Sequence, residues 1–182
     1  VYLGEDISKN LRLEAEYYDT DGKIIDPSSL EQGTMFYLHL HVERDRNIRY
    51  RNIEEIALTQ ILPAGWEVDN IRLSGETLPR WMNEWNLNRE EYTDMRDDRV
   101  SWFFDWTGRW YQRPLDFVIK LLAVTKGEFT LPPAGLAAMY RNDYKAMVKG
   151  MRVEVTEAGE QKKEDDFDAS GAQFTSYLDN ER

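Results

Sequence analysis

Apolar and polar side chains alternate with a period of two along several stretches of this chain. Between residues 11 and 18, leucine, alanine and tyrosine alternate with arginine and glutamate. Successive side chains of a β-strand point to opposite faces, so this pattern predicts a half-buried strand. Asp21-Gly22 then predicts a tight turn, because glycine tolerates a positive φ.

The same pattern recurs further along the chain. Phe36, Leu38, Leu40 and Val42 share one predicted face, with histidine, tyrosine and glutamate on the other. Further strands are predicted at residues 23–25, 34–44, 54–62, 99–106, 115–125 and 151–155. The turn signals between them predict an all-β fold, an antiparallel β-sandwich of about seven strands.

Two segments depart from the strand pattern. Residues 76–94 place Trp81 and Trp85 at helical spacing and predict a loop insertion with one short helix. A second helical turn is predicted at residues 134–140, just after Pro132-Pro133. The sandwich is therefore expected to carry short helical insertions.

Two regions follow from the composition. Residues 1–156 carry the strand patterns and predict one β-sandwich domain. Residues 157–182 contain eight acidic and three basic side chains and predict an acidic, flexible tail. The chain begins at Val1 with neither Met nor a signal peptide, and we interpret it as a piece of a longer polypeptide.

Charge and cysteine content exclude several classes of function. The net charge of -11 argues against nucleic acid and anionic lipid as partners, since both bind through Lys and Arg. The chain has no cysteine, which excludes disulfides and thiol nucleophiles. It also has no apolar run long enough to cross a bilayer, so the fragment itself is expected to be soluble.

The two histidines are the first candidates for chemistry. His39 and His41 stand two residues apart on a predicted strand, so both point to one face, where Glu43 could join them as a metal ligand. The alternative is that both decorate the solvated side of the strand. Two ligands without a recognisable third motif favour that alternative, and we expect no metal and no cofactor.

A dense charge cluster, Arg96-Asp97-Asp98-Arg99, precedes the strand at residues 99–106. Its paired carboxylates could act as general acid and base, with His39 as a partner. Alternating Arg and Asp residues more commonly pair with each other and fix a loop. Because no nucleophile–base pair accompanies them, we expect no enzyme.

Aromatic residues offer a contact surface. Trp102 and Trp106 fall on the inward face of their predicted strand and belong to the core. Four others lie in predicted loops and could bind a sugar or another protein: Trp81, Trp85, Trp110 and Tyr111.

Several spaced blocks carry a family resemblance. In sequence order they are residues 30–34 (LEQGT), 62–70 (LPAGWEVDN), 95–100 (MRDDRV), 123–127 (AVTKG), 131–133 (LPP) and Met139-Tyr140. Together they resemble the C-terminal macroglobulin-like domain of the bacterial α2-macroglobulin family. The resemblance spans roughly residues 11–155 and implies a macroglobulin/immunoglobulin-like sandwich.

The resemblance also implies a role. Family members are large periplasmic protease traps, commonly lipid-anchored, in which a cleaved bait region triggers capture of the protease by a thioester. The domain that this chain resembles docks on the thioester domain of the same chain, and a Met-Tyr pair shields the thioester. That pair corresponds to Met139 and Tyr140, although both could instead close the sandwich's own core.

These observations predict a non-catalytic interaction domain of a bacterial α2-macroglobulin-like protease inhibitor. Its direct partners would be other domains of the parent chain, proteases would be indirect partners, and the compartment would be the periplasm or cell envelope. The alternative is a carbohydrate-binding β-sandwich module of a larger cell-envelope protein.

Overall fold

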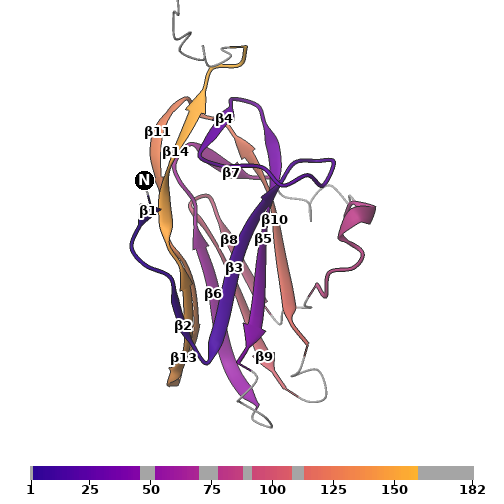
Figure 1. Cartoon of the computed structure of the whole chain (residues 1–182), viewed down its shortest axis with the longest axis vertical. Helices are drawn as coiled ribbons and strands as arrows, with labels where there is room; N and C mark the ends of the chain where they lie inside the picture. Colours follow the sequence, from indigo (N-terminus) through magenta and orange to yellow (C-terminus); the bar gives the residue numbers. More distant parts are fainter. Residues whose placement is uncertain (1, 46–51, 70–77, 88–91, 108–112, 160–182) are drawn as a thin grey trace, which may run out of the picture.

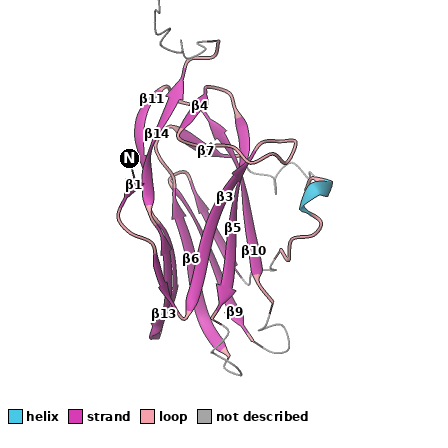
Figure 2. Ribbon diagram, viewed as in Figure 1, coloured by secondary structure: helices cyan, strands magenta, loops and turns pink. Residues whose placement is uncertain are grey.

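The computed structural model describes residues 2–45, 52–69, 78–87, 92–107 and 113–159. Two β-sheets pack face to face, and a third, smaller sheet lies at one end (Figure 1). The predicted all-β sandwich is confirmed. No α-helix occurs in the described residues, and a single 3-10 turn stands out beside the strands in Figure 2.

The larger main sheet has six strands. In spatial order they are β2 (Ile7–Lys9), β13 (Arg141–Val148), β12 (Ala134–Ala138), β6 (Ile53–Ile61), β9 (Arg99–Trp106) and β8 (Tyr92–Arg96). All pairings within it are antiparallel.

The facing sheet has four strands, which lie in the order β3 (Leu11–Tyr18), β5 (Met35–Arg44), β10 (Leu115–Ala123) and β7 (Trp66–Val68). The third sheet orders β1 (Tyr2–Leu3), β14 (Gly150–Thr156) and β11 (Gly127–Leu131), and β4 (Ser29–Glu31) adds to β14 in parallel.

The core lies between the two main sheets. Phe36, Leu38, Leu40 and Val42 of β5 are fully buried, as the period-two pattern predicts. Trp102 and Trp106 of β9 face them from the six-stranded sheet, and both are buried. At about 25 cal/mol per Å² of apolar surface, this layer supplies the main stabilisation of the fold.

Strand number and one helix were mispredicted. The described residues form fourteen strands rather than about seven. The helical turn predicted at residues 134–140 is wrong, because Ala134–Ala138 is the strand β12. Its Ala-Gly-Leu-Ala-Ala sequence has a period-two burial pattern, but small side chains carry too little contrast in hydropathy to reveal it.

The insertion predicted at residues 76–94 is partly described. It contains the 3-10 turn η1 (Arg80–Met82), with Met82 buried beneath it. Residues 78–87 lie beside β10, on the outer side of the four-stranded sheet (Figure 1). The predicted end of the insertion is wrong, because residues 92–94 belong to the strand β8 (Tyr92–Arg96). Among the described residues, no helix has the length and apolarity needed to span a membrane. The predicted tail at residues 157–182 lies outside the described residues from 160 onward.

Candidate functional site

Met139 and Tyr140 form the tip of the hairpin between β12 and β13. Ala138 pairs with Arg141, so these two residues alone make the turn. The side chain of Met139 is 58% exposed and that of Tyr140 is 81% exposed. The alternative that they close the sandwich's own core is therefore wrong. Two adjacent large apolar side chains are presented to whatever lies beyond the tip.

The backbone under this turn is fixed by the neighbouring strand. The Met139 amide donates to the Glu55 carbonyl at 2.9 Å, and the Glu55 amide donates to Asp105 Oδ1 at 2.7 Å. Glu55 has a φ of 54°, in the left-handed region, where β6 is irregular. The turn is thus held by a bulge in β6 rather than by packing of its own side chains.

Trp81 and Trp85 lie together on the outer face of the four-stranded sheet. Their ring centroids are 5.3 Å apart at an interplanar angle of 87°. Both rings also contact Tyr18, with centroids 5.4 and 5.3 Å away. Because these ring faces are largely used within the protein, little of either indole remains for a sugar. Trp110 and Tyr111 lie outside the described residues.

The histidines occupy the same outer face, under the segment that carries Trp85. Trp85 stacks on the His39 ring with centroids 3.9 Å apart and an interplanar angle of 9°. His39 is only 5% exposed. The expectation that both histidines face solvent is therefore wrong for His39, because residues 78–87 cover this part of the sheet.

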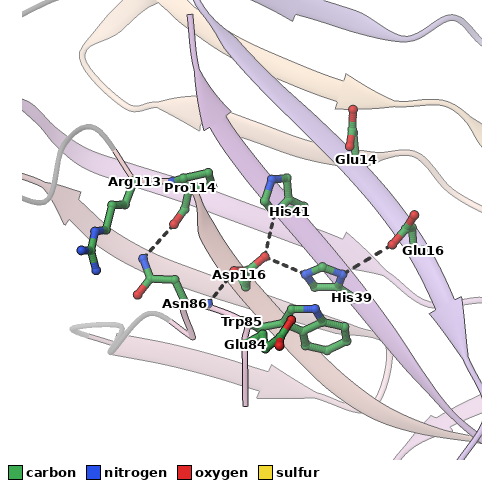
Figure 3. Close-up of a pocket in the computed structure, with 10 residues that line it drawn as sticks. All are labelled: Glu14, Glu16, His39, His41, Glu84, Trp85, Asn86, Arg113, Pro114 and Asp116. Carbon is green, nitrogen blue, oxygen red and sulfur yellow. Dashed lines mark hydrogen bonds and ion pairs between the residues drawn. The ribbon is translucent and has the colours of Figure 1, made fainter. Parts of the chain in front are cut away.

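Asp116 of β10 joins the two histidines (Figure 3). It lies directly opposite His41 in the β5–β10 ladder. His39 Nε2 lies 2.8 Å and His41 Nδ1 lies 2.6 Å from the same oxygen, Asp116 Oδ1. The Asn86 amide donates to the other oxygen, Oδ2, at 2.7 Å. An ionised carboxylate only accepts, so both imidazoles donate to it.

Electrostatics couple these groups. Burial alone would raise the pKa of Asp116, but hydrogen bonds from His39, His41 and the Asn86 amide hold it below its ordinary value. Burial alone would lower the pKa of His41, but its hydrogen bonds with Asp116 and Glu43 raise it instead. The pair therefore favours a carboxylate beside a charged imidazole.

A pocket of about 550 Å³ opens over this cluster. Its lining includes the carboxylates of Glu14, Glu16, Glu84 and Asp116 and a single guanidinium, that of Arg113. The excess of carboxylates over cationic groups in this lining favours binding of a cation over binding of an anion.

Sequence reasoning proposed Glu43 as the third member of this cluster and missed Asp116. One signal was present, since Asp116 stands inside an otherwise apolar strand, where a buried carboxylate requires partners.

The charged segment Arg96–Arg99 forms the turn between β8 and β9. Arg99 donates twice to Asp98, at 3.1 and 2.8 Å, and Arg96 donates to Asp94 at 3.0 Å. These local pairs support the loop-fixing interpretation. Asp97 and Asp98 lie in a turn of the six-stranded sheet's β8–β9 hairpin, whereas His39 lies on β5 of the other sheet, so the structure does not bring the three together.

Comparison with known proteins agrees with this architecture. Residues 11–143 match the family model of the bacterial alpha-2-macroglobulin MG10 domain. An alpha-2-macroglobulin of Xylella fastidiosa strain 9a5c is 31% identical over an alignment of 137 residues, which covers 69% of this chain and 8% of that protein. The chain thus spans under a tenth of the curated relatives it matches.

Solved structures show the same fold. A tyrosine-to-glycine mutant of Salmonella alpha-2-macroglobulin aligns with a TM-score of 0.70 and 26% identity over 85% of this chain and 10% of that one. The Salmonella protein reacted with methylamine aligns with a TM-score of 0.70, 28% identity and the same coverage.

Native Escherichia coli alpha-2-macroglobulin from domain MG7 to the C-terminus aligns with a TM-score of 0.70 over 84% of this chain and 24% of that one. At 23% identity, this last likeness supports the fold alone.

The sandwich, its facing sheets and the matched segment together define a macroglobulin-type domain. More narrowly, the chain belongs to the bacterial alpha-2-macroglobulin MG10 family. The resemblance drawn from the spaced sequence blocks is confirmed at this level.

Proposed function

We propose that this chain is a non-catalytic interaction domain of a bacterial α2-macroglobulin-like protease inhibitor, and that Met139-Tyr140 covers a thioester in a neighbouring domain of the parent. The observation that carries the proposal is the exposure of two adjacent large apolar side chains at the tip of one two-residue hairpin turn. Such pairs are typical anchors of protein interfaces.

The chemistry of a cover explains the residue types. A reactive acyl group survives longer when water and amines are kept away from it. Methionine adapts its shape to an irregular neighbour, and tyrosine adds a flat ring with one hydroxyl for a hydrogen bond. Both therefore suit a surface that must seal against another domain and later release it.

The placement of the turn also supports the proposal. Its backbone is tied to β6 through the Glu55 carbonyl, so the tip is positioned by the sheet and not by a loose loop. The parent's periplasmic location, the position of this domain near the parent's C-terminus and the indirect action on proteases belong to the same proposal.

The test uses the full-length parent with Tyr140→Ala. The rate of spontaneous thioester loss is measured by thiol release and by methylamine uptake. It is expected to rise about tenfold, which corresponds to about 1.4 kcal/mol of protection by the tyrosine. The matched control is Tyr92→Ala, which removes another exposed tyrosine (61% exposed) from β8 of the same sheet. Equal rates in the two variants would refute the covering role.

The upstream sequence of the parent provides an independent test. A Cys-x-Glu-Gln motif before Val1 is expected, because the cover requires a thioester to protect. A parent that lacks this motif would leave only the docking role for the hairpin tip.

A further inference from the structure

The cluster on the outer face of the four-stranded sheet has the composition of a transition-metal site. His39 and His41 come from β5, and Asp116 comes from β10, its hydrogen-bonded neighbour. One donor atom from each residue lies within 4.8 Å of the others. Two imidazoles and one carboxylate are a ligand set that zinc commonly takes in proteins.

The sheet itself sets the convergence of the three side chains. Residues two apart on β5 share a face, and Asp116 sits directly across from His41 on the same face. Ligands held by two paired strands need little ordering when an ion binds, and this lowers the entropic cost of binding.

The spacing between the carboxylate and each imidazole fits a metal after a small adjustment. Asp116 Oδ1 lies 2.8 Å from His39 Nε2 and 2.6 Å from His41 Nδ1. Zinc–ligand distances of about 2.0–2.1 Å in a tetrahedron put donor atoms about 3.3 Å apart. Admitting the ion therefore requires the carboxylate to retreat by roughly half an ångström, and the two imidazole nitrogens, now within 4.8 Å, to approach each other.

Each ligand also has an outer partner. Glu16 Oε2 lies 3.9 Å from His39 Nδ1, and Glu43 Oε1 lies 3.3 Å from His41 Nε2. His39 Nδ1 is buried and makes no hydrogen bond, because Glu16 Oε2 at 3.9 Å lies beyond hydrogen-bond distance. Metal-bound histidines typically direct their second ring nitrogen to a carboxylate, which orients the ring and raises its basicity.

The surroundings complete the arrangement. The Trp85 ring seals one face of His39, and the Asn86 amide holds Asp116 Oδ2, which leaves Oδ1 for the ion. The pocket lies beside the cluster and can supply a water as fourth ligand (Figure 3).

We propose that His39, His41 and Asp116 bind one Zn²⁺ ion, through His39 Nε2, His41 Nδ1 and Asp116 Oδ1, and that the ion fixes the side chains against which Trp85 and Asn86 pack. The imidazole protons then sit on His39 Nδ1 and His41 Nε2, facing Glu16 and Glu43. This site is separate from the hairpin tip, so its failure would leave the proposed function untouched.

The experiment titrates the EDTA-stripped 182-residue chain with ZnCl₂ by calorimetry. A large excess of MgCl₂ suppresses binding to surface carboxylates, because magnesium prefers oxygen ligands and zinc accepts nitrogen. One zinc per chain with a dissociation constant near 1 μM or below is expected. A free zinc concentration a hundred times that dissociation constant should raise the Tm by roughly 5–10 °C.

Variants assign the site. His41→Gln is expected to weaken binding at least about a hundredfold and Glu43→Gln about tenfold, as ligand and outer-partner losses do. Glu67→Gln, an exposed carboxylate on β7, is the charge-matched control and should bind like the parent chain. Circular dichroism confirms that each variant is folded.

A direct spectroscopic readout avoids dependence on the variants. The chain has only two histidines, so both imidazole resonances must shift on zinc addition. Co²⁺ in place of zinc should give d–d absorption of tetrahedral intensity. Binding weaker than about 1 mM in magnesium, or binding that His41→Gln leaves intact, would overturn the proposal.

Discussion

Gly150 passes so close to Leu131 that a Cβ on Gly150 would lie 2.4 Å from the Leu131 carbonyl oxygen. At this point the chain passes between the small sheet and the six-stranded sheet twice. It leaves β11 for β12, and it returns from β13 to β14. Pro132-Pro133 interrupts one strand and Lys149 the other. The close approach therefore sits where one long hairpin passes from one sheet to the next.

Gly150→Ala should destabilise the domain. The added methyl group would meet backbone rather than a flexible side chain, so the hairpin must shift. We expect a loss of about 2–3 kcal/mol in the free energy of unfolding, measured by urea titration.

Gly135→Ala is the matched control, because a Cβ there meets nothing within 4 Å. It lies on β12 of the same hairpin and should be neutral or stabilising by about 0.5 kcal/mol. Equal effects of the two substitutions would show that the contact does not restrict residue 150.

The bulge in β6 allows a second comparison. Glu55 has a φ of 54°, which costs an L-residue about 1 kcal/mol, whereas Glu54 beside it has no positive φ. Both side chains are exposed. Glu54→Gly should cost about 0.5–1 kcal/mol, and Glu55→Gly should cost nothing or stabilise slightly.

Urea unfolding of the two glycine variants measures this difference. Because each variant removes the same side chain from adjacent exposed positions, the difference isolates backbone conformation. A larger loss for Glu55→Gly than for Glu54→Gly would contradict the left-handed assignment.

The sandwich was predictable because its strands alternate strongly. In β5 and β9, large apolar residues on every second position separate the buried face from the other face. The strand β12 was not predictable, since Ala, Gly and Leu fit a helix or a strand equally well. Here the pairing with β6 and β13, a long-range effect, decides the structure.

The candidate sites differ in the same way. Met139-Tyr140 could be found because the pair is contiguous in sequence, and only its exposure needed the structure. The His39–Asp116 contact joins residues 77 positions apart. The pairing of β5 with β10 creates that contact, and no pattern within either strand shows which strands will be neighbours.

The Asp116 cluster should matter for stability even without metal. In EDTA, Asp116→Asn removes the charged acceptor that the His39 and His41 imidazoles share, and His39 is buried. We expect a loss of about 2–3 kcal/mol in the free energy of unfolding. Glu67→Gln also removes one carboxylate charge, and it should change the free energy of unfolding by less than about 0.5 kcal/mol. Similar values for both would mean that the hydrogen bonds of Asp116 do not stabilise the fold.

Tyr140→Ala should leave the stability of the isolated chain within about 0.5 kcal/mol, because 81% of the side chain is already exposed. Met139→Ala should behave in the same way, whereas Leu136→Ala, on the strand β12 that leads into this turn and only 1% exposed, should cost about 2–4 kcal/mol. Urea unfolding of the three variants measures this contrast. If Tyr140→Ala unfolds the chain as readily as Leu136→Ala, any effect on the parent's thioester would reflect misfolding. With stability unchanged, faster thioester loss in the parent can be attributed to the missing contact at the hairpin tip.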